Sequence, residues 1–202
     1  TFLLGAAAVF GCTTGNEELS DAEMMDKAQR LAEENIIVDG HVDLPYRMER
    51  GGFMMQRKVL NVSIDAADGN FDYPRAKQGG LDAPFMSIYI PAQYQYIEGY
   101  AKKFADSLIT MTKQLAATYP DQFAMAYSPA DVKANFAAGK ISLPMGMENG
   151  APVEGDISLV EEYQKKGIRY ITLTHGKDNE ICDSSYDTTR THGGLSAYGR
   201  EV

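Results

Sequence analysis

Short apolar segments alternate with helical segments along most of this chain, and this alternation constrains the fold more than any other feature. Five apolar segments are predicted as strands: residues 36–38, 85–90, 123–127, 141–147 and 168–174. Apolar residues at helical spacing predict a long helix over residues 96–119, which Pro120 ends. Strands that alternate with helices indicate βα units and a mostly parallel sheet. The chain is therefore predicted to have an α/β fold.

Capping and turn residues delimit the other helices. Ser20 and Glu23 have the spacing of a capping box, so a helix should begin there. Residues 128–138 and 156–167 are also predicted helices, because each begins with a residue that can cap a helix. Residues 47–80 show little sustained periodicity and are predicted to be loop-like.

Polar side chains follow the ends of several predicted strands. His41 and Asp43 follow the first strand, Glu148 the fourth and His175 the fifth. An active site at the carboxyl ends of several strands is typical of the (β/α)8 TIM-type barrel, and we predict that architecture. A dinucleotide-binding doubly wound fold lacks support, because no G-x-G-x-x-G motif follows the first strand and no P-loop is present.

The charge of the chain argues against one class of partner. The formal net charge is −9 and the basic residues are scattered, so nucleic acid is not an expected partner.

Cys12 and Cys182 are too few for a disulfide framework and too far apart for a chelating pair. Cys182 is interpreted as a structural residue.

The first residues are predicted to be part of a lipoprotein signal segment. An apolar run over residues 2–10 ends in Gly11 and Cys12, which resembles a lipobox whose cysteine carries the lipid. The run has about half of the roughly 20 residues that a bilayer span needs, as is typical of a signal peptide. Thr1 in place of an initiator Met indicates a truncated segment. The alternative is a buried segment that ends in a free cysteine.

This prediction implies an organisation and a location. Residues 1–12 would be the partial signal segment with its lipobox, residues 13–35 a tether and N-terminal helix, and residues 36–202 the N-terminal part of the barrel. Cys12 would anchor the protein to a membrane through its lipid. The expected location is the bacterial cell envelope, facing the periplasm or the exterior.

His41 and Asp43 lie two residues apart, so an extended backbone directs both side chains to the same face. Imidazole nitrogen and carboxylate oxygen are common zinc ligands, and three protein ligands with an open position leave room for an activated water. The alternative is a polar strand end at which the histidine hydrogen-bonds to a neighbouring loop.

Glu148 ends an otherwise apolar strand and has glycines nearby, so its carboxylate needs a partner. Its two oxygens could bridge two metal ions about 3.5–4 Å apart, which is the usual geometry for hydrolysing amides. A salt bridge or a contact with a helix N-terminus is an equally good interpretation.

Residues 37–45, Ile-Val-Asp-Gly-His-Val-Asp-Leu-Pro, resemble the opening metal motif of the renal (membrane) dipeptidase family. Further blocks resemble this family in the same order: residues 72–75, 79–80, 85–91, 147–150, 167–175 and 194–199. Several colinear blocks are more specific than any single motif. The chain is thus identified as a bacterial lipoprotein member of this zinc metallopeptidase family, with a barrel of the metal-dependent hydrolase kind.

The resemblance implies a role for each of four residues. His41 and Asp43 would bind one zinc ion, and Glu148 would bridge it to a second. His175 would be a catalytic residue that contacts the substrate, and a neutral histidine there could donate a hydrogen bond to the scissile carbonyl.

Other residues carry weaker implications. Tyr46 and Tyr89 match aromatic positions near the family's substrate pocket, but ordinary core packing explains them at least as well. His192 matches no family ligand and is interpreted as a surface-loop residue. Asn149 and Ala151 depart from the Gly and His of some relatives, which leaves the specificity of the subsites open.

The function implied is zinc-dependent hydrolysis of small dipeptides by water activated between two zinc ions. Alternatives are hydrolysis of other small amides, such as β-lactams or N-acyl amino acids, and a non-catalytic envelope-binding lipoprotein. The protein is considered as a possible homodimer.

The family's two further zinc histidines cannot lie in this sequence, because only His175 and His192 follow Glu148. The chain is therefore expected to hold about the first half of the barrel and to be inactive by itself.

Overall fold

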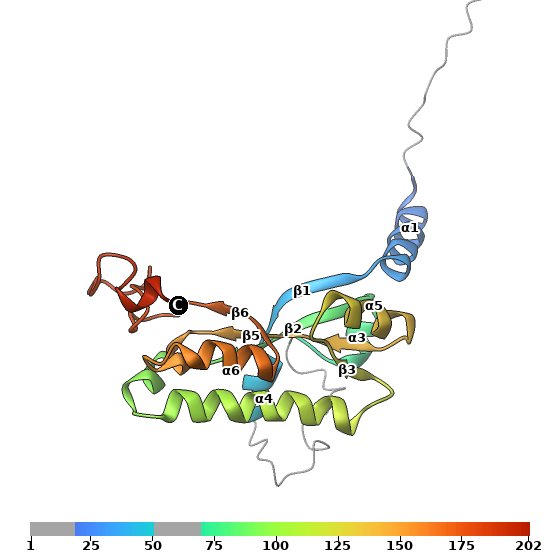
Figure 1. The fold of residues 1–202 in the computed structure, drawn as a ribbon. Coiled ribbons are helices and arrows are strands. Elements are labelled where there is room, and N and C mark those ends of the chain that lie inside the picture. The colour runs from blue at the N-terminus through green and yellow to red at the C-terminus, as the bar shows by residue number, and fades with distance from the viewer. Residues whose placement is uncertain (1–18, 51–69) are drawn as a thin grey trace, which may run out of the picture.

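The computed structural model describes residues 19–50 and 70–202, and its centre is a parallel sheet (Figure 1). The strand order is β1-β2-β5-β6, with bounds Ile37–Val42 for β1, Leu81–Tyr89 for β2, Met145–Glu148 for β5 and Ile168–Thr172 for β6. All neighbouring strands of this sheet are parallel, so the predicted α/β fold is confirmed. The predicted signal segment and Cys12 lie outside the described residues.

The helices of the described ranges are α1 (Asp21–Glu34), α2 (Leu44–Arg50), α3 (Tyr73–Gln78), α4 (Tyr100–Thr118), α5 (Pro129–Ala137) and α6 (Ser158–Lys166). Short 3-10 helices cover η2 (Ala92–Tyr96), η3 (Ala151–Val153) and η4 (Tyr198–Arg200). The predicted capping box is present, because Ser20 Oγ accepts from the Glu23 N–H at 3.4 Å and Glu23 Oε2 accepts from the Ser20 N–H at 2.9 Å. Among these helices, none is both long and apolar enough to cross a lipid bilayer.

The alternation of side chains along β2 separates the core from the site. Met86, Ile88 and Ile90 are fully buried in the core to which α4 contributes, and α4 and α6 lie on one side of the sheet (Figure 1). Successive side chains of a strand point to opposite faces, so Ser87 and Tyr89 lie on the face away from α4. We call this face the open face, and the site forms on it.

The strand predicted over residues 141–147 is two strands in the structure. β4 (Ile141–Leu143) pairs with β3 (Phe123–Met125) in a separate sheet, whereas β5 joins the main sheet. Pro144 separates them, because it has no N–H to donate, although its carbonyl accepts from the Met86 N–H at 2.8 Å. The prediction of a single strand is therefore wrong.

The loop predicted over residues 47–80 contains helical segments where the structure describes it. Most of α2 falls within it, and α3 begins at a clear N-terminal signal. Asp72 accepts from the Arg75 N–H at 2.8 Å, and Pro74 stands in the first turn, where a missing N–H is tolerated. The loop prediction is wrong for these parts, because short helices show too few turns for their periodicity to be recognised.

Candidate metal centre

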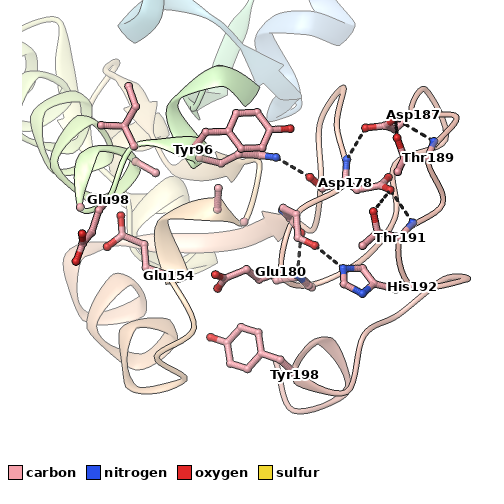
Figure 2. A pocket seen from close by; sticks show the side chains of 18 residues that line it. Tyr96, Glu98, Glu154, Asp178, Glu180, Asp187, Thr189, Thr191, His192 and Tyr198 are labelled. Carbon is pink, nitrogen blue, oxygen red and sulfur yellow. Dashed lines mark hydrogen bonds between the residues drawn. The ribbon is translucent and has the colours of Figure 1, made fainter.

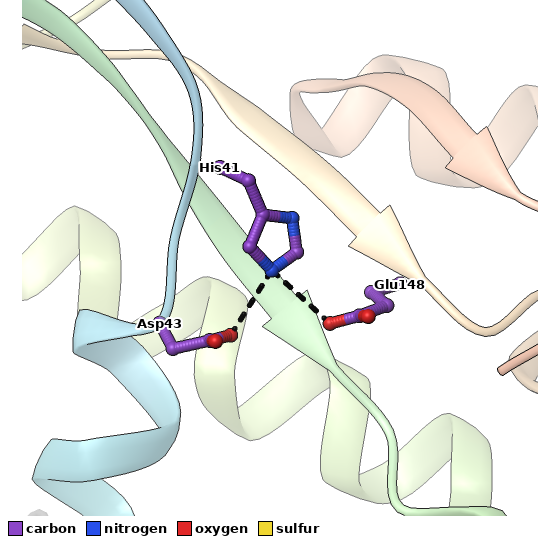
Figure 3. A group of neighbouring side chains, drawn as sticks. All are labelled: His41, Asp43 and Glu148. Atoms are coloured by element: carbon purple, nitrogen blue, oxygen red, sulfur yellow. Dashed lines mark ion pairs between the residues drawn. The ribbon is translucent and has the colours of Figure 1, made fainter. Parts of the chain in front are cut away.

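Three side chains meet at the carboxyl ends of the strands (Figure 3). His41 lies in β1, Asp43 follows that strand directly, and Glu148 is the last residue of β5. His41 Nε2 lies 3.3 Å from Asp43 Oδ1 and 3.2 Å from Glu148 Oε2. Because β2 lies between β1 and β5, the cluster spans β2 on the open face.

The donor set of this cluster fits a divalent cation. One imidazole nitrogen and two carboxylate oxygens lie within 4.8 Å of one another. A tetrahedral ion with bonds of about 2.0–2.2 Å holds its ligands about 3.3–3.6 Å apart, close to the separations from His41 Nε2. This nitrogen carries at most one hydrogen and cannot donate fully to both carboxylates, whereas a cation attracts both. The three residues together therefore suit a metal ion of the zinc type.

The Glu148 carboxylate faces a histidine on each side. Its Oε2 lies near His41 and accepts from Ser87 Oγ at 3.4 Å, whereas its Oε1 lies 3.5 Å from His175 Nε2. The Glu148 side chain is 19% exposed, while those of His41 and His175 are 39% and 42% exposed. Both imidazoles can therefore be reached by a small ligand beside a sheltered carboxylate.

His175 lies in the loop that follows β6. The strand ends at Thr172, two residues earlier than predicted, so the loop and not the strand positions His175. Its carbonyl accepts from Ser184 Oγ at 2.5 Å. Asp178 organises the same loop by accepting from the N–H groups of Thr191 and Ser184, and these hydrogen bonds hold the pKa of its carboxyl below the usual value.

Of the two predicted aromatic residues, Tyr89 contacts His175 and Tyr46 packs against Tyr89. Tyr89 and His175 have ring centroids 4.9 Å apart, and Tyr89 Oη lies 3.5 Å from His175 Nδ1. The Tyr46 ring packs edge-on against Tyr89 at 4.9 Å. Burial raises the pKa of the Tyr89 hydroxyl, and Tyr46 and the carboxylate of Glu148 raise it further, so this hydroxyl stays protonated.

Tyr170 on β6 also reaches the cluster, and the sequence interpretation missed it. Its hydroxyl donates to the Gly40 carbonyl at 2.9 Å and lies 3.4 Å from His41 Nδ1. Gly146 makes room for this ring, because a Cβ there would lie 2.0 Å from it. A glycine inside a strand often marks such a close approach, and this was the available signal.

The Tyr170 hydrogen bond joins the two outer strands of the sheet. In a flat sheet, β1 and β6 would lie about 14 Å apart, three times the strand spacing, so the sheet must be curved. Burial raises the pKa of the Tyr170 hydroxyl, and the carboxylates of Glu148 and Asp43 raise it further. Tyr170 therefore reaches the cluster as a neutral phenol.

Asn149 is a second residue whose role was not recognised. It follows Glu148 with φ 75°, a left-handed conformation that asparagine tolerates better than most residues. Its buried Nδ2 donates to the Ile90 carbonyl at 3.1 Å, and its Oδ1 accepts from Asn179 Nδ2 at 3.0 Å. These bonds fix the end of β5 to the segment after β2 and to the loop that carries His175.

A cavity of about 780 Å³ is formed by η2, η3 and the loop after β6 (Figure 2). Its lining includes the carboxylates of Glu98, Glu154 and Glu180. The three residues of the cluster do not line it, and neither does His175. His192 lines it and is exposed, which fits a surface-loop residue. The candidate metal ligands and His175 therefore lie outside this cavity.

Residues 25–202 match the family described as membrane dipeptidase, peptidase family M19. This match covers most of the chain and every residue of the cluster. The chain belongs to the membrane dipeptidase family. Membership of this M19 family confirms the resemblance seen on residues 37–45 and the later blocks.

Related M19 and dipeptidase sequences and structures extend this match. Dipeptidase ataJ of Aspergillus terreus is 31% identical over 192 residues, which cover 92% of this chain and 46% of the relative. The crystal structure of the probable dipeptidase PvdM from Pseudomonas aeruginosa has a TM-score of 0.73 at 22% identity, and the match covers 90% of this chain and 46% of that one.

A metallopeptidase from Rhodobacter sphaeroides, liganded with a phosphinate mimic of the dipeptide L-Ala-D-Ala, has a TM-score of 0.67 at 19% identity. That match covers 82% of this chain and 54% of the metallopeptidase. The predicted barrel architecture is thereby confirmed over about half of its length. The chain spans about half the length of the curated relatives it matches.

Proposed function

We propose that the complete protein containing this chain is a metal-dependent dipeptidase that hydrolyses the peptide bond of small dipeptides. Membership of the M19 family supports the reaction class. The observation that carries the proposal is the meeting of His41, Asp43 and Glu148 around one point on the open face. A dipeptide substrate is favoured because a solved relative binds a dipeptide mimic.

Zinc is the proposed metal, with two ions in the complete site. His41 and Asp43 would hold one ion, and the Glu148 carboxylate would be shared with the second. Bound zinc ions supply Lewis acidity, which polarises a carbonyl and lowers the pKa of water. The mixture of one imidazole and two carboxylates is a donor set that zinc accepts.

The residues around Glu148 would bind and orient the dipeptide. His175 has an exposed ring beside this carboxylate, where its Nε2–H can donate to the carbonyl oxygen as negative charge develops. Tyr89 and Tyr46 form an aromatic wall behind His175 and would limit how the dipeptide lies. Asn149 would keep the His175 loop and the Glu148 strand end at a fixed separation.

Turnover of a dipeptide panel tests this function, with and without a chelator. We expect hydrolysis that the chelator abolishes and added zinc restores. A β-lactam and an N-acyl amino acid belong in the panel, and preferential cleavage of either would replace the dipeptide assignment with another amide. Cleavage that is insensitive to the chelator, or no cleavage at all, would contradict the proposal.

We also propose that the protein is lipid-anchored in a bacterial cell envelope, on the strength of the apolar run that ends at Cys12. Cys12→Ala is expected to move the protein from the membrane fraction to the soluble fraction. The reason is that each buried CH₂ of a lipid chain contributes about 0.8 kcal/mol to membrane binding. Cys182→Ala is the matched control, because it removes the other cysteine. Membrane association of the Cys12 variant after a salt wash would contradict the anchor.

A further inference from the structure

The two histidines that face Glu148 are presented in the same way. His41 Nε2 lies 3.2 Å from Oε2, and His175 Nε2 lies 3.5 Å from Oε1. On the far side of each ring, Nδ1 faces a tyrosine hydroxyl, Tyr170 at 3.4 Å for His41 and Tyr89 at 3.5 Å for His175. The two histidine–tyrosine pairs differ in what else the hydroxyl binds.

The single hydroxyl hydrogen of Tyr170 is already committed. It is donated to the Gly40 carbonyl at 2.9 Å, so the Tyr170 oxygen can only accept from His41. In that case Nδ1 of His41 carries the hydrogen, and its Nε2 presents a lone pair to Asp43 and Glu148. A lone pair at this position is what a cation requires of a histidine ligand.

The hydroxyl hydrogen of Tyr89 is not donated to a backbone carbonyl of the described residues in this way. Within residues 19–50 and 70–202, the Tyr89 hydroxyl has no hydrogen-bond partner besides His175 Nδ1. Its hydrogen is therefore available to that nitrogen, which then accepts and leaves the hydrogen of the neutral ring on Nε2. His175 thus presents a donor on the side that faces Glu148.

We propose that these two tyrosines assign opposite tautomers to the two histidines. Tyr170 makes His41 a metal ligand, and Tyr89 makes His175 a hydrogen-bond donor to the substrate. Both tyrosines are positioning residues, because they act through the histidines. The inference rests on the proposed function and explains why similar placement beside Glu148 gives the two rings different tasks.

The test compares Tyr170→Phe with Tyr89→Phe in the complete protein, measuring zinc affinity by chelator competition and kcat and KM on a dipeptide. Tyr170→Phe should weaken zinc binding by about 10–100-fold, the usual loss when the outer partner of a metal-binding histidine is removed. Tyr89→Phe should leave zinc affinity unchanged and lower kcat more than it raises KM.

Tyr163→Phe is the matched control for losing a buried hydroxyl. Tyr163 donates to the Pro152 carbonyl at 3.3 Å, away from the cluster, so its variant should keep both zinc affinity and kcat. Nitrogen-15 spectra of the histidine rings read the tautomers directly. We expect Nδ1–H for His41 and Nε2–H for His175, with signals assigned by their loss in the corresponding alanine variants.

The outcomes separate this inference from the proposed function. If Tyr170→Phe keeps the zinc affinity of the parent, or if both rings have the same tautomer, the tautomer assignment is overturned. The proposed function then stands as long as the parent binds zinc and hydrolyses dipeptides. A parent that binds no zinc through His41 overturns both.

Discussion

His41→Ala is expected to weaken zinc binding by more than about 100-fold, beyond what the loss of an outer partner causes. His41 contributes the nitrogen that lies within 3.3 Å of both carboxylates, and without it Asp43 and Glu148 face each other across the site. Dipeptide turnover should fall in proportion to the metal that remains bound. Metal content after dialysis and turnover with added zinc measure the two effects separately.

His192→Ala is the matched control for this variant. His192 is exposed and does not belong to the cluster, so its loss should change zinc affinity by no more than about twofold, as for an ordinary surface substitution. Full zinc occupancy and unchanged turnover in His41→Ala would remove His41 from the ligand set. An equal loss in both variants would point to a general effect on folding.

A polypeptide of residues 1–202 alone is expected to aggregate and to show no dipeptide turnover. In the described residues, β1 pairs only with β2 and β6 only with β5, so each of these outer strands has one edge without a neighbouring strand. Ile37 and Val38 on β1 are 37% and 55% exposed. An unpaired parallel edge with exposed apolar side chains is a template for pairing with another chain.

Light scattering after gel filtration and calorimetry test this expectation. Val38→Lys is an informative second variant, because a lysine on an edge strand opposes edge-to-edge pairing. It should raise the monomeric fraction of the 202-residue polypeptide without restoring turnover. A monomeric parent polypeptide with one cooperative thermal transition and zinc-dependent turnover would contradict both parts of the prediction.

The presence and order of the strands were more predictable from the sequence than their exact ends. The apolar run before His41 and the proline after residues 85–90 are local signals, and β1 and β2 overlap the predicted segments, although β1 extends to Val42 and β2 begins at Leu81. The division at Pro144 was not predictable in the same way. Whether a proline interrupts a strand depends on which neighbour needs its missing N–H, and that neighbour is distant in sequence.

In the candidate site, too, the local relationships could be predicted from the sequence and the long-range ones could not. The two-residue spacing predicted that His41 and Asp43 share a face, and the structure places them together. Spacing alone could not place Glu148 beside them, because that depends on β2 lying between β1 and β5. Tyr170 was overlooked since a tyrosine in a strand looks like core, and its partners Gly40 and His41 lie on another strand.

The hydrogen bond from Tyr170 to Gly40 has a consequence for the order of events during folding. It joins residues 130 positions apart, on β6 and β1, which are separated in the sheet by β2 and β5. Contacts between such distant residues form slowly, because the entropy of closing the loop is lost before the contact stabilises anything. We therefore expect the inner strands to assemble first, and His41 to acquire its orientation in the candidate metal centre among the last steps. On this expectation, a nascent chain gains its helices and apolar core before His41, Asp43 and Glu148 reach the geometry that a metal ion would need.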